Sequence, residues 1–239
     1  MKKINFILIA LFAIIFGACT DDSNEYATRL FTDSEMNRAF RQCLKQSADT
    51  ANAHLCVPNS DELGFYMYAD QSYRIGMPAS AKNITDTLVD YGHGDLIDSL
   101  VFKTNVAAAY CGNALNTFYS NMFSDMSFVD PYRILNGDST ALTTYFEKNH
   151  YNRLFVQVQT LLSTNMTLQG ATTAWNNVIT KYYELTGQVV SIDFNSYASK
   201  SFTDSFILEM KKEEALIRRD ASHRGEKTSK LYEVFAILD

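Results

Sequence analysis

Residues 201–219 read Ser-Phe-Thr-Asp-Ser-Phe-Ile-Leu-Glu-Met-Lys-Lys-Glu-Glu-Ala-Leu-Ile-Arg-Arg, and this stretch decides the fold. Its apolar residues recur mostly at intervals of three and four, the spacing that places side chains on one face of an α-helix. We therefore predict a long helix that buries this face in the protein core. The apolar residues are Phe202, Phe206, Ile207, Met210, Leu216 and Ile217.

The charged residues of this helix have a simpler expected role. Glu213 and Glu214 are adjacent, so their side chains point in different directions and do not form the convergent carboxylate pair of an acid–base catalyst. Glu214 and Arg218 lie four residues apart. We expect them to form an ordinary pair on the helix surface, contributing about 0.2–0.5 kcal/mol.

The helical period continues through most of the chain. Thr32 and Glu35 have the spacing of a capping box, which opens a helix. Only 10 Gly and 3 Pro occur, and no internal repeat is visible. The run 189–192 is rich in β-branched residues but isolated, and a lone strand has no partner. We predict an all-α, single-domain multi-helix bundle over residues 32–239, in which Ala107 and Ala108 allow a close helix contact.

The first residues have the pattern of a secretory signal peptide. Lys2 and Lys3 precede an apolar run, 4–16, that ends in Gly17-Ala18-Cys19. A retained transmembrane helix is the alternative, but spanning a bilayer takes about 20 apolar residues and this run is shorter. We predict that residues 1–18 are a cleaved signal peptide.

Gly17-Ala18-Cys19 also resembles a bacterial lipobox, in which the cysteine is acylated and becomes the new amino terminus. Phe16 stands where most lipoboxes have Leu, and a chance cysteine is the alternative interpretation. The acidic pair Asp21-Asp22 resembles the export signal of Bacteroidetes surface lipoproteins. We expect residues 19–31 to form a lipidated flexible tether, and the protein to be an outer-membrane lipoprotein of the cell envelope, on the periplasmic or the surface side.

The net charge of the chain excludes one class of binding partner. The formal charge is −6 with a pI near 5.2, whereas nucleic-acid binding normally needs a basic surface, so nucleic acid is excluded as a partner. Removing residues 1–18 leaves a charge of −8, because two lysines and no acids are lost.

Three cysteines, Cys43, Cys56 and Cys111, remain in addition to Cys19. They allow at most one internal disulfide, with three possible pairings. We favour buried, inert thiols over a disulfide.

No motif indicates a metal or cofactor. The four histidines are scattered over different segments, without the spacing of a zinc or iron site. The chain also lacks a nucleophile elbow and a phosphate-binding loop. We therefore expect no cofactor. The four are His54, His93, His150 and His223.

Aromatic residues are abundant, with 14 Tyr and 16 Phe. Tyr66, Tyr68 and Tyr73, or Tyr182 and Tyr183, are placed so that they could line an amphipathic groove for a glycan, a lipid or a protein. The alternative, which we favour, is packing at the boundary between helices and solvent.

Three blocks of the sequence form a recognisable series. The first runs from Arg74-Ile75-Gly76-Met77-Pro78 through the Gly92-His93-Gly94-Asp95 turn to Ala108. The second is Ile134-Leu135-Asn136-Gly137-Asp138 to Phe146, and the third is 210–220 followed by Leu231 and Val234-Phe235. Together these blocks resemble the domain of unknown function 4197 family of bacterial envelope proteins. In the first block, Asn105-Val106-Ala107-Ala108-Ala109 stands where the family has Asn-Arg-Ala-Ala-Glu.

The resemblance implies an all-helical fold, and it carries no activity or catalytic residue with it. It draws attention to positions that form a groove or belong to a family motif. These positions are Asn105, Tyr145, Phe146, Glu214 and Arg218.

Two functions from different classes are compatible with the sequence. The first is a lipid-anchored, non-catalytic helical module, binding or structural, whose partner is another envelope protein, a glycan or a lipid. The second is a hydrolase-type enzyme with a site assembled from distant residues such as Asn105, Tyr145 and Glu214. A deep pocket that contains several of these side chains would favour the enzyme.

The lipobox generates a direct test. Replacing the thiol in Cys19→Ala removes the acylation site, so we expect an uncleaved signal and no lipid. Incorporation of radiolabelled palmitate measures this. Equal label in the variant and the parent protein would contradict the lipoprotein assignment.

Overall fold

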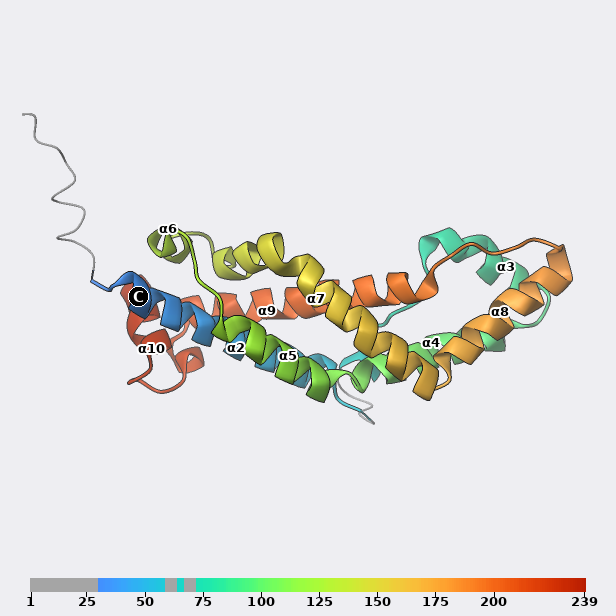
Figure 1. Ribbon diagram of the computed structural model, residues 1–239. Coiled ribbons are helices and arrows are strands. Elements are labelled where there is room, and N and C mark those ends of the chain that lie inside the picture. Colours follow the sequence, from blue (N-terminus) through green and yellow to red (C-terminus); the bar gives the residue numbers. More distant parts are fainter. Residues whose placement is uncertain (1–29, 59–63, 67–71) are drawn as a thin grey trace, which may run out of the picture. The chain divides into compact units, whose positions relative to one another are not determined.

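Helix α9, Phe194–Arg219, packs against both α2, Asp33–Leu55, and α7, Ala141–Leu168, in the computed structural model (Figure 1). The structure describes residues 30–58, 64–66 and 72–239. The helix predicted over 201–219 is confirmed, and it begins earlier because Asp193 caps it by accepting a hydrogen bond from the Ser196 backbone N–H at 2.9 Å.

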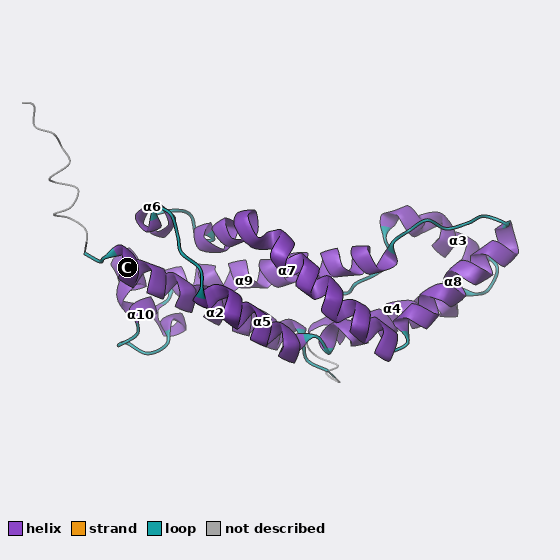
Figure 2. Cartoon of the chain, viewed as in Figure 1, coloured by secondary structure: helices purple, strands orange, loops and turns teal. Residues whose placement is uncertain are grey.

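The remaining helices confirm the all-α prediction, and the described residues contain no strand (Figure 2). The run 189–192 is an irregular connection between α8 and α9, with Val189 exposed. The helices are α3 (Lys82–Asp90), α4 (Gly94–Ala109), α5 (Gly112–Ser124), α6 (Pro131–Leu135), α8 (Ala171–Thr186) and α10 (Lys230–Phe235). Short 3-10 turns are η1 (Gly64–Tyr66), η2 (Ala79–Ala81), η3 (Ala221–Arg224) and η4 (Ala236–Leu238).

The chain divides into two units, Met1–Thr32 and Asp33–Asp239. The predicted signal peptide and Cys19 lie outside the described residues, as does most of the predicted tether. Within the described part of the chain, no helix combines the length and the apolar character needed to cross a bilayer.

Local sequence signals set several helix boundaries. Gly92 has a φ of +79°, a left-handed conformation that suits glycine, and it turns the chain between α3 and α4. Pro131 occupies the first turn of α6, where its missing N–H removes no hydrogen bond, and Asp130 accepts from the Arg133 N–H. Helix α7 runs without a break from Ala141 to Leu168, since no glycine or proline interrupts it.

Edge-to-face aromatic contacts join the helices around α2. The Phe40 ring meets those of Phe128 at 5.3 Å and Phe235 at 6.1 Å, and Phe123 of α5 meets Phe146 of α7 at 5.4 Å. Such pairs add about 0.5–1.5 kcal/mol each beyond the burial of apolar area. These contacts hold α2, α5, α7 and α10 around one core.

The small residues of α4 lie at a helix junction. Ala107 and Ala108 are completely buried, and α4 packs against both α7 and α8. Close packing leaves no room for a longer side chain at these positions.

We therefore expect Ala108→Leu to overpack the junction and to lower the free energy of unfolding by about 1–3 kcal/mol. Ala114→Leu is the matched control, since Ala114 is exposed on α5. Urea denaturation measures both variants. Equal unfolding midpoints for Ala108→Leu and the control would contradict the close packing of α4.

Candidate functional site

Glu214 and Arg218 form a buried ion pair, so the prediction of an ordinary surface pair is wrong. Their side chains are 0% and 6% exposed, and the Arg218 Nε–H donates to Glu214 Oε1 at 2.7 Å. The apolar periodicity of residues 201–219 could not reveal the burial of this pair, because it does not show that two helices, α2 and α7, pack against α9. A buried pair is tolerated only when its remaining hydrogen-bonding groups are satisfied.

Glu214 satisfies its carboxylate by capping another helix. It accepts hydrogen bonds from the backbone N–H groups of Leu142, at 2.9 Å, and Thr143, at 2.6 Å. These groups belong to the first turn of α7, where Thr140, the residue before the helix, makes no side-chain capping bond. A negative charge is also favourable at a helix N-terminus. Glu214 therefore supplies the cap that α7 lacks locally.

Arg218 satisfies its guanidinium at the end of a second helix. Its two terminal nitrogens donate to the carbonyls of Leu135, at 2.7 Å, and Ile134, at 3.1 Å, which close α6. The guanidinium also lies over the Phe235 ring, 5.4 Å from its centre. The pair thus ties the end of α6 and the start of α7 to α9, and it fixes the turn 136–140 between them.

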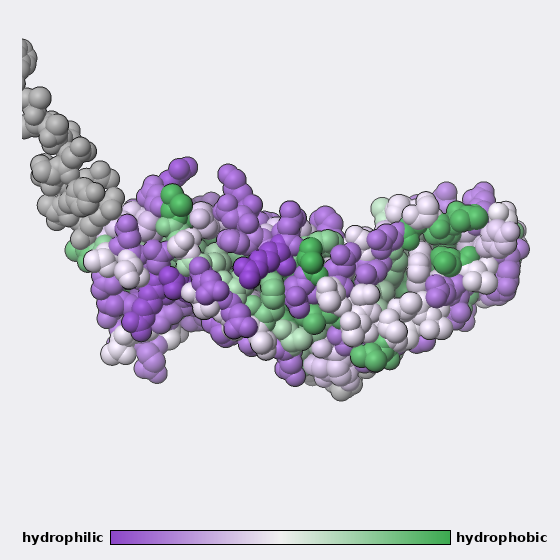
Figure 3. Space-filling model, viewed as in Figure 1, coloured by the Kyte–Doolittle hydropathy of each residue, from purple (hydrophilic) through white to green (hydrophobic). Residues whose placement is uncertain are grey.

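This turn forms one wall of a groove of about 500 Å³ between α6 and the first half of α7. The groove is amphipathic, with both signs of charge at its rim. In Figure 3 the surface over α6 and the start of α7 is mostly hydrophilic, with isolated hydrophobic positions. The principal lining residues are Val129, Arg133, Ile134, Asp138, Tyr145 and Lys148.

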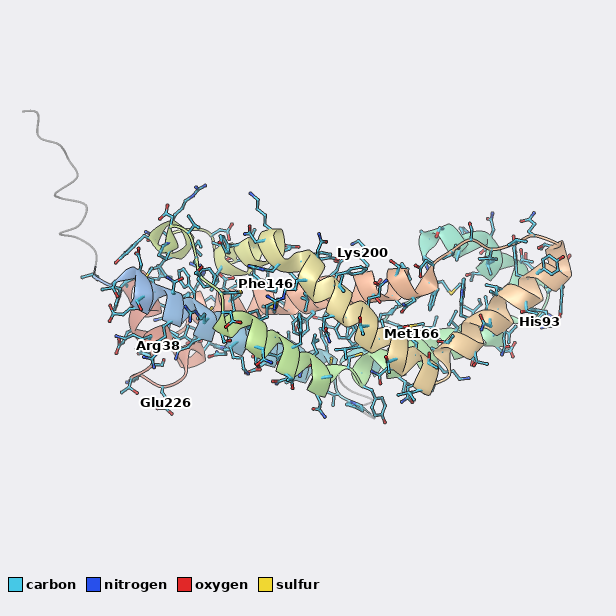
Figure 4. All side chains as sticks on the ribbon, viewed as in Figure 1. Arg38, His93, Phe146, Met166, Lys200 and Glu226 are labelled. Carbon is cyan, nitrogen blue, oxygen red and sulfur yellow. The ribbon has the colours of Figure 1, made fainter. Side chains whose placement is uncertain are left out.

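The predicted pair Tyr145 and Phe146 divides between groove and core. Tyr145 lines the groove, and its ring packs 5.5 Å from that of Phe128. Phe146, labelled on α7 in Figure 4, is completely buried and stacks on His150. Phe146 therefore lies in the core while its neighbour Tyr145 lines the groove, because consecutive helical residues point about 100° apart.

Asn105 performs a backbone role on α4. Its amide exchanges two hydrogen bonds of 2.9 Å with the backbone N–H and C=O of Ile75 and donates a third to the Val101 carbonyl. None of these hydrogen bonds joins it to Glu214 or Tyr145. Of the three residues offered as examples for the enzyme hypothesis, the groove is lined by Tyr145 and not by Asn105 or Glu214.

A second polar cluster, which sequence reasoning missed, surrounds Glu209 on α9. This buried carboxylate accepts hydrogen bonds from the Tyr73 hydroxyl and from Lys212 at 2.5 Å, and its other oxygen lies 3.1 Å from His54 Nδ1. The three-residue spacing of Glu209 and Lys212 was the available signal. Burial disfavours the carboxylate, but the hydrogen bonds outweigh it and hold the pKa of Glu209 below its ordinary value.

The lowered pKa of Glu209 is that of a stabilising contact rather than of a general acid. We call this cluster of Glu209, Tyr73, Lys212 and His54 the clasp, because it joins separate segments of the chain. A general acid at neutral pH needs a raised carboxyl pKa, whereas Glu209 is shifted the other way. Burial, followed by the hydrogen bond to Glu209, raises the pKa of Tyr73. Both groups therefore keep their ordinary charge states at neutral pH and hold the segment 72–78 against α9 and α2.

The structure separates the two tyrosines of the second predicted cluster, Tyr182 and Tyr183, by their exposure. Tyr182 is buried and its hydroxyl donates to Gln188 at 2.9 Å, while Tyr183 is 55% exposed beside a smaller cavity. The Tyr66 side chain and Tyr68 lie outside the described residues.

No group of three His, Cys, Asp or Glu residues that could hold a metal occurs in residues 30–58, 64–66 and 72–239. In the structure Cys43, Cys56 and Cys111 are free thiols. Cys43 and Cys111 are buried, whereas Cys56 is partly exposed.

The fold and groove define an all-α protein in which a buried ion pair shapes an amphipathic groove. The chain belongs to the family described as "Protein of unknown function (DUF4197)", whose sequence profile matches residues 30–236. The resemblance read from the three sequence blocks is thereby confirmed. No curated protein and no solved structure matches the chain.

The buried pair predicts a large effect for Glu214→Gln. The change leaves the Arg218 charge buried without its partner, so we expect a loss of about 3–5 kcal/mol in the free energy of unfolding. Urea denaturation measures it, with exposed Glu226→Gln as the control, which should change the stability by less than about 0.5 kcal/mol. Adding Arg218→Met to Glu214→Gln should recover part of the loss. A single-variant loss below about 1 kcal/mol would fit an exposed pair instead.

The Glu209 cluster predicts a pH dependence of stability. Since the folded-state pKa of Glu209 is lowered, its contribution is complete above the unfolded carboxyl pKa of about 4.3 and is lost as the pH falls through the folded value. The parent protein should therefore lose more unfolding free energy than Glu209→Gln between about pH 5 and pH 3. Urea denaturation across this range measures both. Parallel pH profiles would count against the clasp.

Proposed function

We propose that this protein is a lipid-anchored, non-catalytic binding module of the bacterial envelope, which binds a segment of another envelope protein in the groove between α6 and α7. The observation that carries the proposal is the groove itself, an amphipathic surface whose wall is held by the Glu214–Arg218 pair. A preformed surface binds with a smaller entropic cost, because little of it must be ordered on binding.

The lining chemistry favours a polypeptide over the other two partners. Arg133 and Lys148 carry positive charge, and Asp130 and Asp138 carry negative charge, around the apolar Val129. An anionic lipid headgroup would meet two carboxylates, and a sugar ring would find one tyrosine as a stacking surface. A peptide offers apolar side chains and both signs of charge, so it can complement the whole lining.

The roles of the polar residues support a binding function over the enzyme. Glu214, Arg218 and Asn105 direct their hydrogen bonds largely to backbone groups of neighbouring segments. These bonds stabilise helix ends and a buried loop. Such residues position the surface, and the groove residues that face solvent make the contacts with the partner.

The anchor places this surface close to its partners. The tether 19–31 has thirteen residues, so its fully extended reach is at most about 45 Å. Attachment through more than one acyl chain is stable, and it raises the effective concentration of any partner in the same membrane. The net charge of −8 after cleavage repels the folded body from anionic lipid.

Site-specific photo-crosslinking in cells tests the proposal. A photoreactive residue at Asn149, which lines the groove, should capture a defined envelope protein; the same residue at Thr164, exposed on the same helix, should not. The soluble form without the signal should capture it more weakly than the Cys19-anchored form.

The affinity of the purified captured protein for this protein and its variants is then measured. The charge reversals Arg133→Glu and Lys148→Glu together should weaken binding at least tenfold, and Lys227→Glu, at an exposed position outside the groove, should not change it. Equal capture at Asn149 and Thr164 would contradict the groove. Turnover of a small molecule by the purified body, or recovery of only glycan or lipid, would replace the proposed function.

A further inference from the structure

Two thiols lie together where α2 ends and where α4 passes into α5. Cys56 directly follows α2, and Cys111 lies in the short junction before Gly112. A Cβ atom placed on Gly112 would lie 2.8 Å from the Cys56 Cβ and 3.4 Å from the Cys56 carbonyl oxygen. Because Gly112 has no side chain, Cys56 can approach the junction this closely.

The third cysteine lies elsewhere in the core. Cys43 is thirteen residues before Cys56, which corresponds to about 20 Å along a helix axis. It lies close to the Glu214–Arg218 pair, whose charges act on its thiol. The three pairings that the sequence permits are therefore reduced to one by position alone.

The surroundings of the two thiols raise the pKa of both. The Cys111 Sγ–H donates to the Ala107 carbonyl at 3.4 Å, and the Asn165 amide donates to the same sulfur at 3.6 Å. Burial raises the pKa of Cys111 to about 12. Burial, and then the neighbouring Cys111, raises the pKa of Cys56. Protonated thiols react slowly, so oxidation belongs to the stage of folding before Cys111 is buried.

We propose that Cys56 and Cys111 form a disulfide in the mature protein, a modification that joins the end of α2 to the α4–α5 junction. The inference rests on the proposed export to the envelope, where an oxidising protein disulfide supplies the reaction.

The reaction proceeds by exchange. One cysteine thiolate attacks the disulfide of the oxidant and forms a mixed disulfide. The second cysteine thiolate then attacks the sulfur of the first. The oxidant leaves as a dithiol, so the protein loses two protons and two electrons, and the oxidant gains both.

The bond closes a loop of 56 residues that includes all of α3 and α4 and the Ile75 backbone bound by Asn105. Cross-linking a long loop restricts the unfolded chain. The oxidised protein should therefore melt several degrees above the reduced protein.

Peptide mapping tests the pairing directly, because trypsin separates the three cysteines. Cys43 falls in peptide 42–45, Cys56 in 46–74 and Cys111 in 104–133. The full-length protein is expressed in bacteria with its signal, and free thiols are alkylated before lysis. We expect a species linking 46–74 to 104–133 that disappears on reduction, with Cys43 alkylated.

Two further measurements separate the pairing from the export on which it rests. Palmitate labelling reports acylation of Cys19 in the same cells, and refolding in a glutathione redox buffer tests the pairing without export. Free Cys56 and Cys111 in acylated protein, or no link after refolding, would overturn the proposal. A link after refolding, with unacylated and unlinked protein in cells, would support the pairing geometry and overturn the export.

Variants provide the matched control. The melting temperature of the parent protein and of Cys43→Ala should fall equally when a reductant is added. Cys56→Ala and Cys111→Ala should show no response to the reductant. A response that persists in either of these two variants would contradict the assigned pair.

Discussion

The ion pair between Glu214 and Arg218 is the interaction on which the arrangement of α6, α7 and α9 depends. A carboxylate and a guanidinium are removed from water, and each is compensated by two further hydrogen bonds to backbone groups. Those backbone groups lie at the ends of α6 and α7, which carry unpaired carbonyls and N–H groups. The charges and the helix ends thus satisfy one another, and neither would be tolerated in the core alone.

The same principle continues at the end of α9. Arg224 is completely buried; it donates to the carbonyls of Ile217 and Arg218 and pairs with the Asp239 carboxylate. One arginine therefore closes the helix that carries the central ion pair. Asn105 acts similarly on α4, where its amide binds both backbone groups of Ile75. Arg224, Asn105 and the central ion pair thus bind backbone groups of neighbouring segments, and none of them lines the groove between α6 and α7.

The candidate positions named from the sequence lie at different places in the structure, because most of them bind backbone groups in the core. Glu214, Arg218 and Asn105 were candidate positions because they lie in blocks shared with the family. The backbone partners of the ion pair are 71 to 84 residues away in the sequence, and the Ile75 backbone is 30 residues away from Asn105. Only Tyr145 reaches the groove. The Glu209 cluster also joins three separate segments, and its lowered carboxyl pKa is that of a stabilising contact.

The sequence by itself determined the helical class, the position of the long helix through 201–219, the family, and the turn at Gly92. Each depends on residues near one another in the chain, such as a period of three to four, a capping residue or a glycine with positive φ. The burial of Glu214 and Arg218, the groove, and the nearness of Cys56 to the α4–α5 junction were decided only by the tertiary structure. They depend on which helices cover a given face, and helical periodicity carries no information about a neighbour that lies 70 residues away.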